Sequence, residues 1–196
     1  MLRRVPLEKI ENFRDVGGYA ARYGETSFGV LYRSGTLSDA TPEDLDKLAS
    51  LGIKTILDLR DDESKKLQPD KTQNDSRFAE ILLPVNGNGR VPKDHEDQID
   101  SYLEMIEEPV SARRIFLAIA HGLKPLVIHC TAGKDRTGIF IALILLANGV
   151  PFHDVNADYM LSFPYLTRMS RLTMLKYPDL PKTVLTPDVA FLKEVM

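Results

Sequence analysis

The sequence predicts an α/β fold in which helices flank a mainly parallel central sheet. Short apolar runs alternate with longer stretches of helical periodicity, which is the order that a parallel sheet requires. One apolar run at 125–128 also leads through a glycine-containing loop into a nine-residue apolar run at 139–147. Such a strand, tight loop and buried helix form half of a βαβ unit. The length of 196 residues suits one domain, so we expect a single domain over residues 1–196.

Each predicted strand is a short apolar run bounded by turn residues or charges. After an irregular N-terminal segment at 1–20, strands are expected at 28–33, 53–59, 80–83 and 125–128. The charged stretch 61–75 is expected to be a surface connection or a short solvated helix. The stretch 86–94 is rich in Asn, Gly and Pro and is expected to be a flexible loop, either a lid beside a site or an ordinary exposed connection.

The first predicted helix has the clearest start signal. Thr41 suits the N-cap, Pro42 the first position and Asp44 the third, while Gly52 closes the helix. Apolar periodicity and breaker residues predict further helices around 99–106 and 115–119, separated by Pro109, and over 139–147, 153–162, 165–177 and 191–196.

These helices are expected to pack in different ways. The helix at 139–147 is apolar on nearly all sides and should be the buried central one. The apolar residues of 99–106 and 115–119, Phe116 among them, are expected in the core. The helix at 165–177 is basic and amphipathic, a pattern that can contact anionic lipid. Its cations are only Arg168, Arg171 and Lys176, so packing against the sheet is expected instead.

Composition and charge narrow the functional classes. The net charge of −3 gives no case for nucleic acid as a partner. The longest apolar run is half of what a membrane span requires, so no transmembrane segment is expected. The single cysteine, Cys130, excludes an intrachain disulfide framework and suits a reduced compartment. We see no secretory signal of the usual kind and expect a cytoplasmic location, with a secreted effector as the alternative. The sequence does not indicate an oligomeric state.

The stretch His129-Cys130-Thr131-Ala132-Gly133-Lys134-Asp135-Arg136-Thr137-Gly138 joins the fourth predicted strand to the central helix. The stretch therefore lies at the carboxyl end of a strand, where open α/β sheets hold their ligands. It also leads into a helix N-terminus, which attracts anions. Gly133 permits a tight turn, and the planar Arg136 fork can hold two phosphate oxygens. In this field the Cys130 thiol should ionise easily and act as an in-line nucleophile. The expected phosphate-binding residues are Thr131, Ala132, Gly133, Lys134, Asp135 and Arg136.

Thr137 has two readings that the sequence does not separate. Its hydroxyl could donate to the thiolate or the leaving sulfur, or it could bond to the backbone of the first helical turn. Histidines show no metal-ligand spacing, and the loop itself supplies positive charge. No metal or other cofactor is therefore expected.

The pattern His-Cys-x5-Arg-Thr-Gly resembles the cysteine-dependent protein tyrosine phosphatase superfamily. Four further blocks at 12–18, 32–38, 56–60 and 157–162, with the 132–136 core, resemble its atypical microbial branch. The likeness covers roughly residues 10–165. It implies a tyrosine-phosphatase-like fold and an enzyme of dual or triple specificity, whose substrates are phosphoproteins and phosphoinositides. Members of this branch often continue further, so the chain is either a shorter member or truncated at its C-terminus.

The sequence offers several candidates for the acid that protonates the leaving oxygen, because the chain has no tryptophan and so no Trp-Pro-Asp loop. The resemblance favours Asp135, which lies inside the phosphate loop (residues 130–136). Asp58 ends a predicted strand at the same sheet edge and is the second candidate for a catalytic or arginine-orienting role. Asp94 and Asp97 are the remaining candidates.

The sequence thus predicts a phosphomonoester hydrolase acting on phosphotyrosine, and on phosphoserine, phosphothreonine or phosphoinositides in addition. Lys134 adds a second cation that either favours substrates with several phosphates or only raises the local potential. Arg14 and Arg33 either line the rim or form buried ion pairs with aspartate. The alternatives for the whole chain are a catalytically silent phosphate-binding module and a phosphatase specific for inositol polyphosphates or nucleotides.

Overall fold

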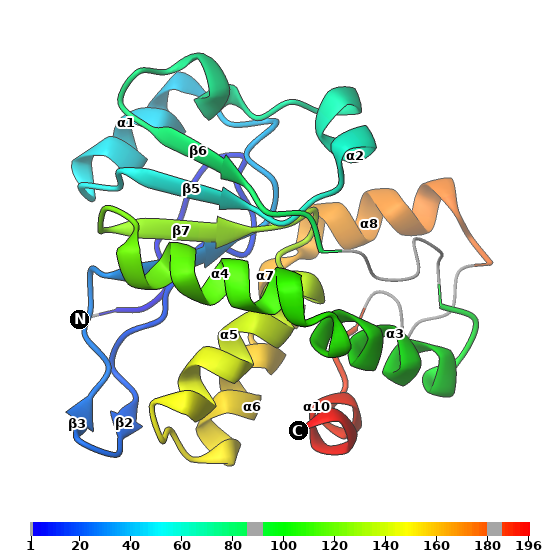
Figure 1. Cartoon of the computed structure of the whole chain (residues 1–196). Coiled ribbons are helices and arrows are strands. Elements are labelled where there is room, and N and C mark those ends of the chain that lie inside the picture. Colours follow the sequence, from blue (N-terminus) through cyan, green and yellow to red (C-terminus); the bar gives the residue numbers. More distant parts are fainter. Residues whose placement is uncertain (1, 86–91, 180–185) are drawn as a thin grey trace.

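Five strands form the central sheet in the order β1-β4-β7-β5-β6 (Figure 1). The computed structural model describes residues 2–85, 92–179 and 186–196. Four neighbouring strands are parallel, namely β4 (Leu31–Ser34), β7 (Leu126–His129), β5 (Thr55–Asp58) and β6 (Ala79–Leu82). The short edge strand β1 (Arg14–Asp15) runs antiparallel to β4. The predicted α/β class with a mainly parallel sheet is therefore confirmed.

The central strand β7 is buried on both faces of the sheet. Leu126 and Ile128 belong to one hydrophobic core, whereas Val127, between them, belongs to the other. In the neighbouring β5, Leu57 and Ile56 divide in the same way. Strands buried on both faces are continuously apolar instead of alternating, which explains why short apolar runs marked them in the sequence.

Helices cover both faces of the sheet (Figure 1). On one face α1 packs against the smaller core through Leu48, which is fully buried. On the other face α3, α4, α5, α6 and α10 surround the larger core. The helices are α1 (Pro42–Ser50), α2 (Asp62–Leu67), α3 (His95–Glu107), α4 (Pro109–His121), α5 (Arg136–Ala147), α6 (Phe152–Met160), α7 (Ser162–Tyr165), α8 (Thr167–Lys176) and α10 (Val189–Val195). A 3₁₀ helix, η1 (Lys71–Asn74), follows α2.

Two helices follow the sequence prediction closely. Thr41 and Asp44 form a reciprocal capping box at the start of α1, and Gly52 beyond its end has a φ of 75°. Helix α5 is buried over most of its length, as its continuous apolar sequence predicts. Its N-terminus directly follows the loop at the end of β7, which places that loop at the carboxyl edge of the parallel strands.

Other parts of the fold differ from the sequence prediction. The N-terminal segment is not irregular throughout, because it contributes β1 to the sheet. A small hairpin of β2 (Ala20–Ala21) and β3 (Gly24–Glu25), which its short strands hid, precedes β4. Phe116 was expected in the core but is 37% exposed, because α4 buries only the side that carries Ile115.

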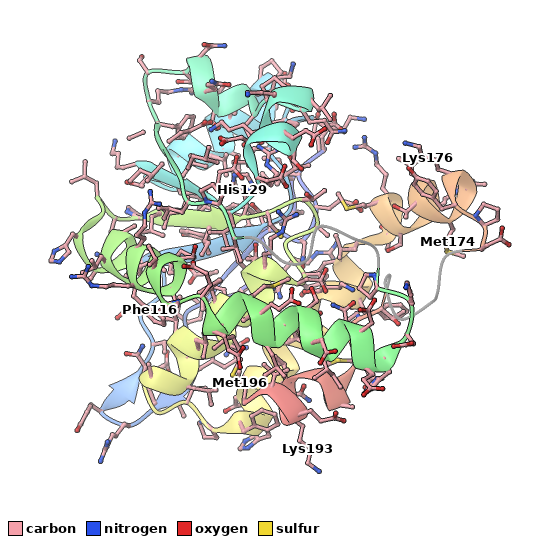
Figure 2. All side chains as sticks on the ribbon, turned by 45° about the vertical axis from the view of Figure 1, so that its right-hand side comes forward. Phe116, His129, Met174, Lys176, Lys193 and Met196 are labelled. Carbon is pink, nitrogen blue, oxygen red and sulfur yellow. The ribbon has the colours of Figure 1, made fainter. Side chains whose placement is uncertain are left out.

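Helix α8 also differs, since it was expected to pack against the sheet and none of its residues is buried. Figure 2 shows it projecting from the body of the molecule, with Met174 and Lys176 on its outer part. It is attached at its first turn, where the Glu11 carboxylate accepts hydrogen bonds of 2.7 Å from the backbone N–H groups of Arg168 and Met169. The apolar periodicity therefore did not report burial here.

Most of the predicted flexible loop at 86–94 lies outside the described residues, which exclude 86–91. Asp94 and Asp97 are described. Asp94 is the N-cap of α3 and accepts from the Asp97 backbone N–H at 2.9 Å. In the described ranges, no helix has both the length and the apolar character to cross a membrane.

Candidate active site

Cys130 lies in the loop between β7 and α5, at the carboxyl edge of the sheet. It is 2% exposed, and its Sγ accepts a hydrogen bond from the Gly133 backbone N–H at 3.3 Å. Gly133 has a φ of +67°, and a Cβ built there would lie 2.1 Å from the carbonyl oxygen of Ser34. Both conditions demand glycine. The turn at Gly133 therefore brings a backbone donor onto the sulfur.

Donors outside the loop hold its carbonyl oxygens. Arg33 Nη2 donates to the Gly133 carbonyl at 2.7 Å, and Asn12 Nδ2 donates to the Ala132 and Gly133 carbonyls at 3.0 Å each. The Thr36 backbone N–H donates to the Thr131 carbonyl at 2.9 Å. Since a carbonyl and the N–H of the same peptide point in opposite directions, these bonds turn the loop N–H groups toward its concave side. That arrangement is an anion-binding nest.

Arg33 is part of a buried ion cluster with Arg14 and Asp158. Asp158 Oδ1 lies 3.0 Å from Arg14 Nε, and Asp158 Oδ2 lies 2.5 Å from Arg33 Nη1. Burial alone would raise the pKa of Asp158, but the two guanidinium charges outweigh it and hold the pKa at about 2. Burial, with the charge of Arg14, lowers the pKa of Arg33 to about 10. Of the two sequence readings for Arg14 and Arg33, the structure has the buried ion pair.

Arg136 begins α5 and folds back over the loop. Its Nη2 donates to Thr131 Oγ1 at 3.2 Å, and its Nη1 reaches the Leu59 carbonyl at 3.5 Å. The Asp61 carboxylate lies 3.7 Å from Nη1, and the Arg136 side chain is 20% exposed. A guanidinium held in this way remains open to solvent on one side and lies beside the concave face, where an oxyanion could receive both of its nitrogens.

Asp135 lies at the rim, and its side chain is 30% exposed. Its Oδ1 accepts a very short hydrogen bond from the Tyr102 hydroxyl and lies 3.3 Å from Lys134 Nζ. The Tyr102 hydroxyl is in turn 2.7 Å from that of Tyr159. Lys134, which the sequence offered as a second cation of the loop, is only 2% exposed.

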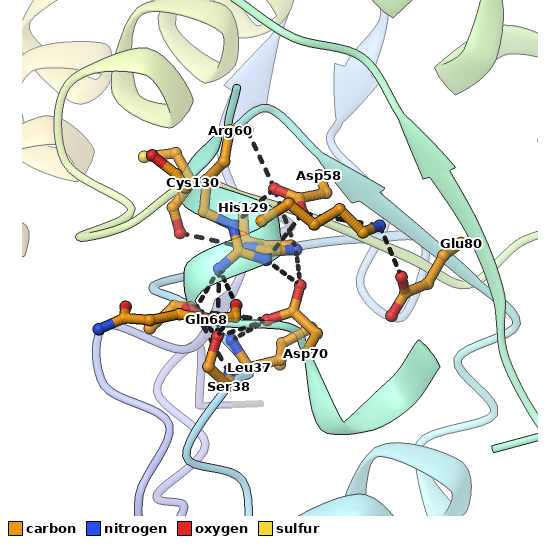
Figure 3. A network of polar contacts seen from close by, with 12 residues as sticks. Leu37, Ser38, Asp58, Arg60, Gln68, Asp70, Glu80, His129 and Cys130 are labelled. Carbon is orange, nitrogen blue, oxygen red and sulfur yellow. Dashed lines mark hydrogen bonds and ion pairs between the residues drawn. The ribbon is translucent and has the colours of Figure 1, made fainter. Parts of the chain in front are cut away.

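Asp58 has a different environment, a buried polar network behind the loop (Figure 3). Arg60 donates to both of its oxygens, at 2.9 Å from Nε and 2.8 Å from Nη2, and Nη2 also lies 2.5 Å from Asp70. Burial opposes the ionisation of Asp58, yet the Arg60 hydrogen bonds and the neighbouring His129 bring its pKa below the usual range. Burial raises the pKa of Asp70.

His129 joins this network to the cysteine. Its Nδ1 is 3.2 Å from the Cys130 carbonyl oxygen, and its Nε2 is 3.3 Å from Asp70 Oδ2 and 3.8 Å from Asp58 Oδ1. Asp58, Asp70 and His129 have the donor set of a metal site. Because the Arg60 guanidinium already lies against both carboxylates, we assign no metal there.

Thr137 is buried, and its hydroxyl has no hydrogen-bond partner among the described residues. Neither of its two expected contacts, with the sulfur or with the helix backbone, is therefore present in that part of the chain.

Sequence reasoning missed several residues that shape the loop. Asn12 and Asp158 lie in blocks that carried the family resemblance, so a signal existed, although it gave no role. Arg33 was expected at the rim or in a buried ion pair, and only its hydrogen bond to the Gly133 carbonyl was missed. Tyr102 has no comparable signal, because it is one aromatic position within an ordinary helical pattern.

Comparison with known proteins gives consistent matches. The profile described as the tyrosine phosphatase family matches residues 5–195. A Cupriavidus necator protein named as a tyrosine-protein phosphatase is 34% identical over 168 residues, which cover 79% of this chain and 61% of the relative. A tyrosine-protein phosphatase of Nostoc commune is 32% identical over 147 residues, covering 70% of this chain and 49% of the relative. The triple specificity protein phosphatase PtpB of Mycobacterium tuberculosis is 28% identical over 217 residues, which cover 91% of this chain and 76% of the relative. The chain thus spans about half to three fifths of the first two relatives.

Proposed function

Because the chain belongs to the tyrosine phosphatase family, we propose that it is a single-domain phosphomonoester hydrolase that works through a cysteinyl-phosphate intermediate. Phosphotyrosine is the proposed main substrate, since two of the relatives are named as tyrosine-protein phosphatases. Phosphoserine, phosphothreonine and phosphoinositides are further substrates to test, because PtpB is named for triple specificity.

The observation that supports this proposal best is the position of the Cys130 sulfur. It lies under the loop turn, 3.3 Å from the Gly133 backbone nitrogen, while Arg136 folds over the same loop. The carbonyl oxygens of 131–133 are held away from this space by outside donors. A tetrahedral oxyanion placed there would meet backbone N–H groups and a guanidinium, with the nucleophile beneath its central atom.

The proposed reaction has two steps. In the first, the Cys130 thiolate attacks phosphorus, the sulfur–phosphorus bond forms, and the bond to the leaving oxygen breaks. Arg136 and the loop N–H groups stabilise the equatorial oxygens, and Asp135 gives its proton to the leaving oxygen. In the second, Asp135 accepts a proton from water, whose oxygen attacks phosphorus and releases the thiolate and inorganic phosphate.

Environment favours Asp135 over Asp58 as the proposed acid. Asp135 lies in the loop, is partly exposed and can meet a leaving group at the rim. Asp58 is fully buried, and both of its oxygens are engaged by Arg60. We therefore propose a supporting role for Asp58, in which it fixes Arg60 and, with Asp70 and His129, the end of β7. Asp94 caps the N-terminus of α3, and the Asp97 carboxylate accepts a hydrogen bond from the Lys93 backbone N–H.

The direct test is hydrolysis of phosphotyrosine, phosphoserine, phosphothreonine and phosphoinositide substrates by the wild type and by Cys130→Ser. We expect turnover of phosphotyrosine by the wild type and none by Cys130→Ser, which should still bind inorganic phosphate. A wild type that binds phosphate but turns over no substrate would instead indicate a silent phosphate-binding module. Turnover confined to inositol polyphosphates or nucleotides would replace the proposed substrate class, while the residue roles would remain.

A further inference from the structure

A pair of buried tyrosines connects the hydrophobic core to the Asp135 carboxylate. The Tyr102 hydroxyl donates a very short hydrogen bond to Asp135 Oδ1, and the Tyr159 hydroxyl lies 2.7 Å from that of Tyr102. The two rings are 0% and 1% exposed. Three separate elements meet here, because Tyr102 comes from α3, Tyr159 from α6 and Asp135 from the end of the phosphate loop.

The direction of these hydrogen bonds follows from the proton count. A hydroxyl has one proton, and an ionised carboxylate can only accept. Tyr102 therefore donates to Asp135 and accepts from Tyr159. Burial and the nearby Asp135 raise the pKa of both tyrosines far above the usual value, so both keep their protons throughout. The pair is thus a fixed donor, not a group that exchanges charge with the carboxylate.

Gly138 makes room for this arrangement. A Cβ built at Gly138, in the first turn of α5, would lie 2.9 Å from Cδ2 and 3.0 Å from Cε2 of the Tyr159 ring. Any side chain at this position would require the Tyr159 ring or the first turn of α5 to shift. The glycine that closes the Arg-Thr-Gly motif therefore has a structural reason that involves the tyrosine pair.

The contacts of Asp135 are one-sided. Tyr102 and Lys134 Nζ both approach Oδ1, the latter at 3.3 Å. Within the described ranges, Oδ2 forms no hydrogen bond or ion pair with the protein. A carboxyl group held by two donors on one oxygen has its rotation fixed, and its proton must reside on the other oxygen. That oxygen is the one available to a leaving group.

We propose that Tyr102, held in place by Tyr159, is the positioning residue for general acid catalysis by Asp135. This inference rests on the proposed function, in which Asp135 is the acid. During the first step the proton passes from Asp135 Oδ2 to the leaving oxygen, which keeps the electron pair of the broken bond. The carboxylate that forms is stabilised by Tyr102, whose proton does not transfer. In the second step Oδ2 takes a proton from the attacking water, and the cycle closes.

The test uses two aryl phosphates that differ in their need for an acid. Phenyl phosphate has a poor leaving group, whereas 2,4-dinitrophenyl phosphate has a good one. Asp135→Asn should lose about 10²–10⁴-fold on phenyl phosphate and little on the dinitrophenyl ester. Tyr102→Phe should lose about tenfold or more on phenyl phosphate and also spare the dinitrophenyl ester, because it misplaces only the acid.

Two further readouts separate positioning from a merely structural role. The basic limb of the pH–rate profile should move to higher pH in Tyr102→Phe, because the ionised carboxylate loses a hydrogen bond that favours it. The double variant Tyr102→Phe/Asp135→Asn should be no slower on phenyl phosphate than Asp135→Asn alone, since Tyr102 acts only through Asp135. The control is Tyr32→Phe, a buried tyrosine in the other core that stacks on Phe13 at 5.4 Å. It should leave both rates unchanged.

Each outcome bears on a distinct claim. If Asp135→Asn slows both esters equally, Asp135 is not the acid, and this inference is overturned together with that assignment. If Asp135→Asn is selective but Tyr102→Phe slows both esters equally or neither, only the positioning role is overturned. Should Tyr102→Phe not fold, Tyr159→Phe gives the same test, because it leaves Tyr102 present but unheld. Tyr159→Phe should then slow the hydrolysis of phenyl phosphate alone, by less than is expected of Tyr102→Phe.

Discussion

Replacement of Asp158 by asparagine tests the ion cluster that supports the phosphate loop. The substitution keeps the size of the side chain and removes its charge. Arg14 and Arg33, both fully buried, would then lose the carboxylate charge that they share. Breaking a buried ion pair by removing one partner typically destabilises a protein by about 3–5 kcal/mol. We expect a loss in this range for Asp158→Asn.

The pKa of Asp158 gives a second route to the magnitude. Its value of about 2, against an ordinary 3.8, corresponds to about 2–3 kcal/mol of stability from the charged form. Because the folded pKa lies below the ordinary one, this contribution is present above pH 4 and is lost as the pH falls toward 2. The wild type should therefore lose stability across that acidic window, and Asp158→Asn should lose less there.

Urea unfolding at neutral pH measures the loss, and thermal unfolding should show a midpoint lower by about 6–20 °C for a chain of this length. The matched control is Asp46→Asn. Asp46 pairs with Arg77 at 2.6 Å, but its side chain is 75% exposed, so the change should be within about 1 kcal/mol. A loss below about 1 kcal/mol for Asp158→Asn, or equal losses for the two variants, would refute the reasoning.

Three further predictions concern the loop and helix α8. Glu11→Gln should speed hydrogen exchange at the first amides of α8 while α6 keeps its protection, because a charged cap stabilises a helix by about 0.5–2 kcal/mol. Unchanged exchange would contradict the capping role of Glu11. Gly133→Ala should abolish binding of inorganic phosphate, measured by calorimetry, since its Cβ would lie 2.1 Å from a carbonyl oxygen; retained affinity would disprove the tight turn. Asn12→Gly can still adopt the backbone φ of 61° but removes two hydrogen bonds to the loop carbonyls, so kcat/KM should fall about tenfold. A wild-type kcat/KM would show that the loop keeps its shape without these bonds.

The parts of the fold that the sequence predicted well are those with local causes. The capping box at Thr41 and Asp44 is written within four residues, and the apolar runs of β5 and β7 report burial on both sheet faces directly. The cysteine loop was found for the same reason, because strand, glycine turn and helix start are contiguous. Helix α8 shows the limit, since periodicity indicates a helix with one apolar side but not whether anything covers that side.

The supports of the site were less accessible to sequence reasoning, because they are long-range. Asn12 and Arg33 reach Ala132 and Gly133 across separations of 100 residues or more. Asp58 illustrates another difficulty. Its place at a strand end fitted both a catalytic and an arginine-orienting role, and the bidentate contact from Arg60, two positions away, favours the second. Tyr102 could not be assigned at all without its contacts to Asp135 and to Tyr159 of α6.

The hydrogen bonds that hold the carbonyl oxygens of 131–133 away from the site have a consequence for substrate selectivity. Because the surrounding residues set the shape of this site, the site is formed before any ligand binds. Any tetrahedral anion of suitable size, including vanadate or tungstate, should therefore bind there and compete with the substrate of the proposed reaction. In the proposed reaction this site contacts the phosphoryl group of the substrate. Discrimination among phosphorylated molecules must then come from the surfaces around its opening.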